Sequence, residues 1–232
     1  MILTSCNKDH LFDCLKSSGK TITAERSIPA FSKIEMENNV DLVFRKAGNY
    51  SVKVTAGANL IEWITTVVND STLFIKNENK CNWARDFNNE FKVEITTPAL
   101  VFINNKGSGD IMFEDTVSVY EFRYDNSNAS GNIDLKANCD RIVVNIHNGT
   151  ADLTVRGKAG INFLYYNGYG YMNFKDISTN ITYINNQGTG DCRINVKDDL
   201  EAQIKHIGNI YYSGNPVNIK SEITGTGLLI HE

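Results

Sequence analysis

The phrase Gly107-Ser108-Gly109-Asp110-Ile111 opens a series that decides the fold of this 232-residue chain. Six related phrases follow it: Ser130-Gly131-Asn132-Ile133, Thr150-Ala151-Asp152-Leu153, Tyr169-Gly170-Tyr171-Met172, Thr189-Gly190-Asp191-Cys192, Ile207-Gly208-Asn209-Ile210 and Thr226-Gly227-Leu228-Leu229. Their aligned positions lie 22, 20, 19, 20, 18 and 19 residues apart. Strands of an ordinary β-sandwich recur at shorter and less regular intervals, so this period predicts stacked coils.

Alternating apolar and polar residues surround each phrase, which is the pattern of a β-strand with one buried side. Val143-Val144-Asn145-Ile146 and Ile181-Thr182-Tyr183-Ile184 are two strands of this kind. Successive coils of a parallel solenoid rise by about 4.8 Å, so equivalent residues stack directly on one another. The sequence therefore predicts an all-β, parallel β-solenoid, similar to a β-helix, with coils of about 20 residues. One interior column should contain Ile111, Ile133, Leu153, Met172, Cys192, Ile210 and Leu229.

A glycine occupies the aligned corner position in six of the seven units, and Ala151 is the exception. We expect a tight corner there, with little room for a Cβ atom or with a positive φ angle. The structural corner residues are Gly109, Gly131, Gly170, Gly190, Gly208 and Gly227. Asparagines precede the corners, where stacked amides could hydrogen-bond between coils. They are Asn104, Asn105, Asn126, Asn148, Asn167, Asn185 and Asn186.

The chain before residue 99 lacks the glycine repeat and has a different residue pattern. Alternating runs such as 40–44, 50–54 and 91–95 predict half-buried strands, and 58–64 is the one plausible helical turn. We therefore divide the chain into a terminal tether (1–20), an N-terminal β region with one short helix (21–98) and the solenoid repeats (99–232).

Charge and composition exclude several classes of partner. Lys and Arg number 23 against 27 Asp and Glu, a net charge of −4, so no global basic field attracts nucleic acid. No apolar run approaches the roughly 20 residues of a membrane helix, so membrane contact is expected only through a lipid anchor.

The N-terminal phrase Leu3-Thr4-Ser5-Cys6 resembles a bacterial lipobox, in which the cysteine sulfur receives diacylglycerol. The resemblance implies lipidation of Cys6 and an outer-membrane-anchored lipoprotein of the cell envelope, either periplasmic or surface-exposed. Only five residues precede Cys6, so most of a signal peptide is missing and a chance match stays open.

The remaining cysteines form no metal template, because the chain has no CxxC pair and only 4 histidines. We expect no metal and no cofactor. An exported protein could oxidise Cys14 with Cys81, since both lie in loop-like sequence. Cys192 falls in the apolar column and should be a small buried hydrophobe.

A longer set of phrases resembles one bacterial family, the head GIN domain of a putative auto-transporter adhesin. The resemblance covers about residues 20–232. It begins at Arg26-Ser27-Ile28-Pro29-Ala30-Phe31-Ser32-Lys33-Ile34 and continues through Val40-Asp41-Leu42-Val43, Val52-Lys53-Val54, Asn59-Leu60, Leu73-Phe74-Ile75 and the glycine repeats. It implies secreted or lipid-anchored envelope proteins with β-solenoid character and no catalytic residues to carry over.

Rival motifs fit the same residues less well. Gly107-Ser108-Gly109 and Gly188-Thr189-Gly190 resemble the start of a dinucleotide loop, but both lack the third glycine and precede a strand. Calcium-binding nonapeptides recur every nine residues, although adjacent coils could still align Asp110, Asn132 and Asp152 as a weak cation site. A polysaccharide-active enzyme could use Asp110, Asp152 and Asp191, which capping of the corners explains equally well.

Tyrosines gather in the fourth to sixth coils, and flat aromatic rings beside Asn and Asp are typical of surfaces that bind sugars or proteins. The candidate binding residues are Tyr165, Tyr166, Tyr169, Tyr171 and Tyr183, with inward packing as the alternative. The leading hypothesis is a non-catalytic, envelope-anchored, adhesin-like module that binds a glycan or a cell-surface protein. A structural scaffold or assembly subunit is the runner-up, a polysaccharide-active enzyme is third, and a homo-oligomer competes for the same surface.

Overall fold

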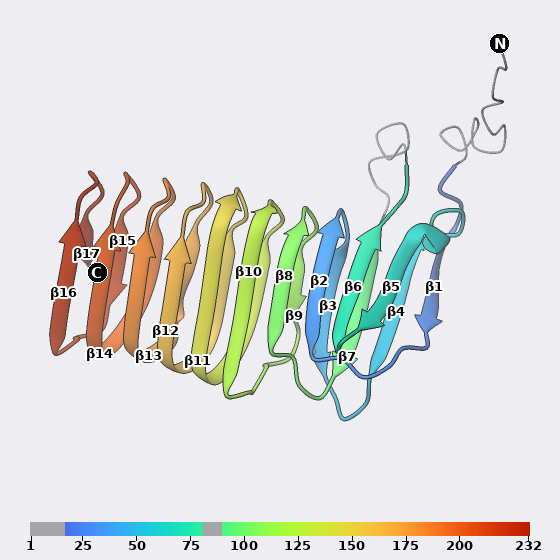
Figure 1. Ribbon diagram of the computed structural model, residues 1–232, viewed down its shortest axis with the longest axis horizontal. Coiled ribbons are helices and arrows are strands. Elements are labelled where there is room, and N and C mark those ends of the chain that lie inside the picture. Colours follow the sequence, from blue (N-terminus) through green and yellow to red (C-terminus); the bar gives the residue numbers. More distant parts are fainter. Residues whose placement is uncertain (1–16, 81–89) are drawn as a thin grey trace, which may run out of the picture.

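The computed structural model describes residues 17–80 and 90–232 and shows one β-solenoid (Figure 1). Each coil gives one strand to each of two facing layers, here named sheet A and sheet B. The long strands β11 (Ile133–Gly149), β12 (Leu153–Tyr166), β13 (Met172–Asn186) and β14 (Cys192–Ile204) bend, so their first halves lie in sheet B and their second halves in sheet A. The prediction of a parallel solenoid with coils of about 20 residues is confirmed.

The other strands belong to one sheet each. Sheet A also contains β5 (Ile64–Asn69), β6 (Thr72–Asn77), β2 (Lys33–Asn38), β8 (Phe102–Gly107), β10 (Glu121–Ala129) and β16 (Asn218–Ile223). Sheet B also contains β1 (Thr21–Arg26), β4 (Ser51–Gly57), β7 (Lys92–Thr97), β3 (Asp41–Lys46), β9 (Ile111–Phe113), β15 (Ile210–Ser213) and β17 (Leu229–His231). Figure 1 shows the coils stacked side by side from β16 at one end to β1 at the other.

The interior column predicted from the repeat is confirmed residue by residue. Ile133 pairs with Ile111 on one side and with Leu153 on the other, and Cys192 lies between Met172 and Ile210. The six residues from Ile111 to Ile210 in this column are buried, while Leu229 in the last coil is half-buried. Stacking equal positions of successive coils thus makes a continuous apolar core along the solenoid axis.

Residues before position 98 build the first coils of the same two sheets. Strand β2 lies between β6 and β8 in sheet A, and β3 lies between β7 and β9 in sheet B. Three antiparallel pairings then close this end, because β5 covers β6 while β4 and β1 extend sheet B beyond β7. The expected helical turn is a single 3₁₀ turn, η3 (Ile61–Trp63).

The corner glycines are explained by close packing of the coils. None of the six predicted corner glycines has a positive φ, so that part of the expectation is wrong. A Cβ atom at Gly190 would lie 1.7 Å from the carbonyl oxygen of Gly170 in the preceding coil. Gly131 meets the Gly109 carbonyl and Gly208 the Gly190 carbonyl in the same way. Glycine is therefore favoured at six of the seven corners because backbone from one coil touches backbone from the next, and only Ala151 carries a Cβ at this position.

Buried asparagines satisfy the backbone at these corners. The N–H of Gly107 donates to Asn105 Oδ1, and the N–H of Gly188 donates to Asn186 Oδ1, each at 2.9 Å. The Asn186 amide also donates to the Gly208 carbonyl of the next coil at 3.1 Å. These side chains take up corner groups that neither sheet can pair, which explains polar residues in an apolar interior.

Candidate functional site

The aspartates of the glycine phrases serve the corners. The N–H of Asn132 donates to Asp110 Oδ1 at 2.7 Å, and the N–H of Asn209 donates to Asp191 Oδ1 at 2.9 Å. Asp152 accepts the N–H of Tyr171 in the same manner. Each carboxylate thus caps the next coil. Among the described residues no three His, Cys, Asp or Glu side chains gather as metal ligands.

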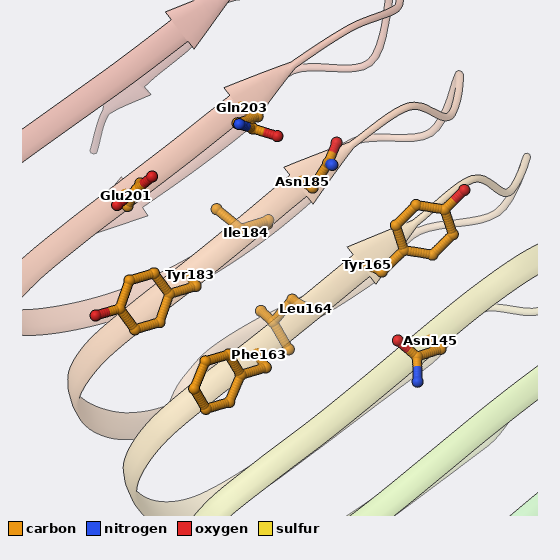
Figure 2. Close-up of a pocket in the computed structure, with 9 residues that line it drawn as sticks. All are labelled: Asn145, Phe163, Leu164, Tyr165, Tyr183, Ile184, Asn185, Glu201 and Gln203. Atoms are coloured by element: carbon orange, nitrogen blue, oxygen red, sulfur yellow. The ribbon is translucent and has the colours of Figure 1, made fainter.

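An open groove of about 350 Å³ lies on the outer side of sheet A, over the second halves of β11 to β14 (Figure 2). Parallel pairing sets side chains from successive coils in two outward columns that border it. The lining residues are Asn145, Phe163, Leu164, Tyr165, Tyr183, Ile184, Asn185, Glu201 and Gln203.

The first column provides an aromatic surface. Phe163 and Tyr183 are direct register partners, with ring centroids 5.2 Å apart and planes inclined by 8°. The guanidinium of Arg141 lies 5.5 Å from the Phe163 ring centroid, a cation–π contact that helps to hold this ring. Both aromatic side chains are substantially exposed. Figure 2 shows them on the outer surface, with Tyr165 farther along the neighbouring column.

The second column provides polar groups, and most of these already have partners. Asn145 donates its amide to Asp125 at 2.8 Å, and Gln203 donates to Glu222 at 3.0 Å. Asn185 stands between Tyr165 and Gln203 in this column, and its amide forms no hydrogen bond with any described residue. Its Oδ1 is buried and without a partner. A free amide at the middle of the groove is suited to a ligand that brings its own hydroxyl groups.

Apolar and amide side chains make up most of the groove lining. Glu201 is the single carboxylate among the lining residues, and Lys220 pairs with it at 3.2 Å. Hydrolysis of a glycosidic bond requires two carboxyl groups that flank the bond. The lining instead combines flat apolar rings with amide and hydroxyl groups.

The five tyrosines of the sequence analysis separate into three groups. Tyr165 and Tyr183 line the groove. Tyr169 and Tyr171 are exposed at the corner between β12 and β13 and do not line it. Tyr166 is 1% exposed, and its hydroxyl donates to the Gly170 carbonyl inside the solenoid. Burial raises the pKa of Tyr166, and its assignment to the binding surface is corrected to a core position.

Sequence reasoning missed Phe163, Asn145, Asn185, Glu201 and Gln203 as site residues. The signal was present, because Phe163 and Tyr183 are 20 residues apart and so occupy equal positions in neighbouring coils. Tyr165 and Tyr183, by contrast, differ by two positions in register and belong to different columns.

The cysteine predictions divide at the boundary of the described residues. Cys6, Cys14 and Cys81 lie outside them, so lipidation and the proposed disulfide stay predictions. Cys192 is a buried free thiol, as expected from its column, and burial raises its pKa well above the ordinary value. In the described part of the chain, no helix has the length and apolar character needed to cross a membrane.

Fold and groove together define a β-solenoid binding module of the adhesin type. The chain belongs to the family described as putative auto-transporter adhesin, head GIN domain, whose model matches residues 30–216. That description is of a protein of the cell surface or envelope, and the resemblance seen in the sequence is confirmed.

Solved structures share the fold. A putative adhesin from Bacteroides fragilis has a TM-score of 0.84 at 24% identity, with 92% of this chain and 97% of that chain covered. A putative lipid binding protein from Parabacteroides distasonis has a TM-score of 0.73 at 21% identity, covering 93% and 97%. A putative adhesin from Parabacteroides merdae has a TM-score of 0.69 at 19% identity, with 93% of this chain and 97% of that chain covered. A search of curated proteins finds no match.

Proposed function

We propose that this chain is a glycan-binding, adhesin-like module that a lipid anchor holds to the bacterial cell envelope. The observation that carries the proposal is the groove on sheet A, where Phe163, Tyr183 and Tyr165 stand beside the uncommitted amide of Asn185. Sugars present apolar C–H faces next to hydroxyl groups. Aromatic rings bind the faces, and the Nδ2 group of Asn185 can donate to a hydroxyl, while the buried Oδ1 is out of reach of a ligand.

Charge narrows the class of glycan. Arg141 is engaged by the Phe163 ring and by Glu121, and Lys220 is engaged by Glu201, so these two cations beside the groove already have partners. A neutral oligosaccharide therefore fits better than a strongly acidic one, which would need free cationic groups. The groove is open along the sheet, which suits an internal segment of a chain as well as a terminal sugar.

A glycan array probed with the purified protein tests binding, followed by affinity measurements on the glycan that binds best. We expect Tyr183→Ala to weaken binding by about 1–3 kcal/mol, the usual range for the loss of an aromatic anchor. Asn185→Ala should weaken it by a similar order, since an amide that serves only the ligand is removed.

Two control variants make this result specific. Tyr120→Ala removes an exposed tyrosine that does not line the groove. Asn104→Ala removes an amide in the same outward column as Asn185, but this amide donates to Glu35. Both should bind like the wild type. Binding that survives Tyr183→Ala and Asn185→Ala would move the ligand elsewhere, no binding to any glycan would favour a scaffold, and turnover of the glycan would favour an enzyme.

The anchoring part of the proposal rests on the Leu3-Thr4-Ser5-Cys6 phrase and on the family's surface description. Expressed with a complete signal peptide, the protein should incorporate labelled fatty acid and fractionate with membranes. Cys6→Ser should abolish both properties because it removes the acceptor sulfur. An unlabelled, soluble wild type would refute the anchor and leave the groove proposal untouched.

A further inference from the structure

The last coil of the solenoid leaves core positions uncovered. Ile219 and Ile223 of β16 stack in register on Leu200 and Ile204, which are buried. Each of the two isoleucines is nevertheless 46% exposed, and every residue of β16 is exposed. Among the described strands, β14 is the only one that pairs with β16. An apolar inner face and a free strand edge therefore coincide at this end.

The pairing with β14 determines which residues of β16 point their backbone groups to the free edge. The N–H of Thr224, just after the strand, donates to the Ile204 carbonyl at 2.9 Å. Backbone groups of a strand in a parallel pair alternate between its two sides, so the even-numbered residues point toward β14. The N–H and C=O groups of Ile219, Ser221 and Ile223 consequently point to the free side. An exposed edge of this kind is a template for another strand.

The sequence of β16 is complementary to itself. In an antiparallel pair of two β16 strands centred on Ser221, Ile219 faces Ile223 of the other copy and Lys220 faces Glu222. Directly opposite residues lie on the same side of a sheet, so the isoleucines would meet inside and the opposite charges outside. In this register the N–H and C=O groups of Ile219, Ser221 and Ile223, which point away from β14, face the same groups of the other copy. The two strands can therefore exchange backbone hydrogen bonds.

We propose that the C-terminal coil is a homodimer interface, in which β16 pairs antiparallel with β16 of a second copy of this chain. The pairing buries Ile219 and Ile223 and joins two A sheets into one continuous sheet. Exposed Val217 beside the strand adds apolar surface at the same end. Strand β16 lies just beyond residues 30–216, which match the family model.

The dimer would place both grooves on the same side of the assembly, a consequence that rests on the proposed function. A twofold axis normal to the joined sheet keeps each outer face outward. Five strand steps separate β13 from its copy, about 24 Å at the usual spacing. Two grooves at this distance could bind one polysaccharide or neighbouring surface glycans, and the avidity would exceed that of a single groove.

Sedimentation equilibrium of charge variants tests the interface without any glycan. The wild type should approach twice the 25.9 kDa of one chain as concentration rises. Lys220→Glu places acid against acid across the axis, and Glu222→Lys places base against base, so each variant alone should dimerise at least tenfold more weakly. An equal mixture of the two should form heterodimers, because each Glu then faces a Lys of the other copy.

Ser221→Pro is a second variant with an independent prediction. The N–H that it removes points to the free side, and proline is tolerated on edge strands, so the monomer should fold while the dimer is lost. Melting temperatures of all variants check the fold. A wild type that stays monomeric at millimolar concentration, or charge variants that fail to associate on mixing, would overturn the proposal while leaving glycan binding by the single groove intact.

Discussion

The two ends of the solenoid terminate one interior column in opposite ways. Pairing register links Ile75 on β6, through the successive coils, to Ile223 on β16. Ile75 is 0% exposed because β5 folds back over its coil, whereas Ile223 is 46% exposed. A coil buries its neighbour but cannot bury itself, so a closed end requires strands outside the repeat. The chain provides such strands at the N-terminal end.

The largest difference between the ends should appear when the column is truncated. Ile75→Ala removes a fully buried side chain, and we expect a loss of about 2–5 kcal/mol in the free energy of unfolding. Ile223→Ala at the open end should cost less than about 1 kcal/mol in dilute, monomeric protein, since half of the side chain is already in water. Urea unfolding measures both. Equal losses would mean that the open end is covered in solution.

Corner packing gives a second comparison, between a stacked corner and a turn of the closing region. Gly190→Ala forces a Cβ against the Gly170 carbonyl and should cost about 1–3 kcal/mol through overpacking. Gly48→Ala, between β3 and β4, meets no atom within 4 Å and should leave stability nearly unchanged. Thermal unfolding separates the two variants. A Gly190→Ala protein as stable as Gly48→Ala would show that the coils can move apart at the corner.

The smallest effect concerns the capping side chains at the two ends. Near the closed end Asp41 accepts the backbone N–H of Asp110, a residue that is itself a carboxylate, at 2.8 Å. Near the open end Asp191 accepts the backbone N–H of Asn209, whose side chain is an uncharged amide. Burial raises the pKa of Asp41 above its ordinary value, and the neighbouring charge of Asp110 contributes. The native state therefore binds this proton more tightly than the unfolded chain does, so ionised Asp41 weakens stability as the pH rises through the carboxyl range.

Asp41→Asn keeps an oxygen acceptor and removes the charge. We expect a slightly more stable protein at pH 7, with an advantage over the wild type that shrinks as the pH falls below the native pKa of Asp41. Urea midpoints across the acidic range measure this difference. An advantage that is constant with pH, or a variant that is less stable at pH 7, would contradict the role of burial.

The sequence alone predicted the parts of this molecule that repeat. The 20-residue period located Ile111, Ile133 and the rest of their column, because stacking makes sequence position equal to spatial position. The closed end escaped prediction because β2 and β3 are inserted between strands that come later in the chain. Such pairings give no repeat in the sequence. A single run of alternating residues predicts a strand, but it does not show which other strand it pairs with.

The candidate site was predicted in outline but not in composition. Alternation along a strand assigns Tyr165 outward and Tyr166 inward, and only the outward residue lines the groove. Phe163 could have been found by applying the repeat period to Tyr183. The importance of Asn185 could not, because it depends on which amides find partners across the coils, as Asn145 does with Asp125.

The side-chain amide spectrum of isotopically labelled protein tests most directly whether the groove binds a glycan. Asn185→Asp identifies the Asn185 amide signal by its disappearance, and the wild type is then titrated with the glycan selected on the array. The account predicts that this signal moves and saturates with the measured affinity, while the amide of Asn104, which is bound to Glu35, stays in place. Saturable binding that leaves the Asn185 signal unmoved would contradict the proposed site.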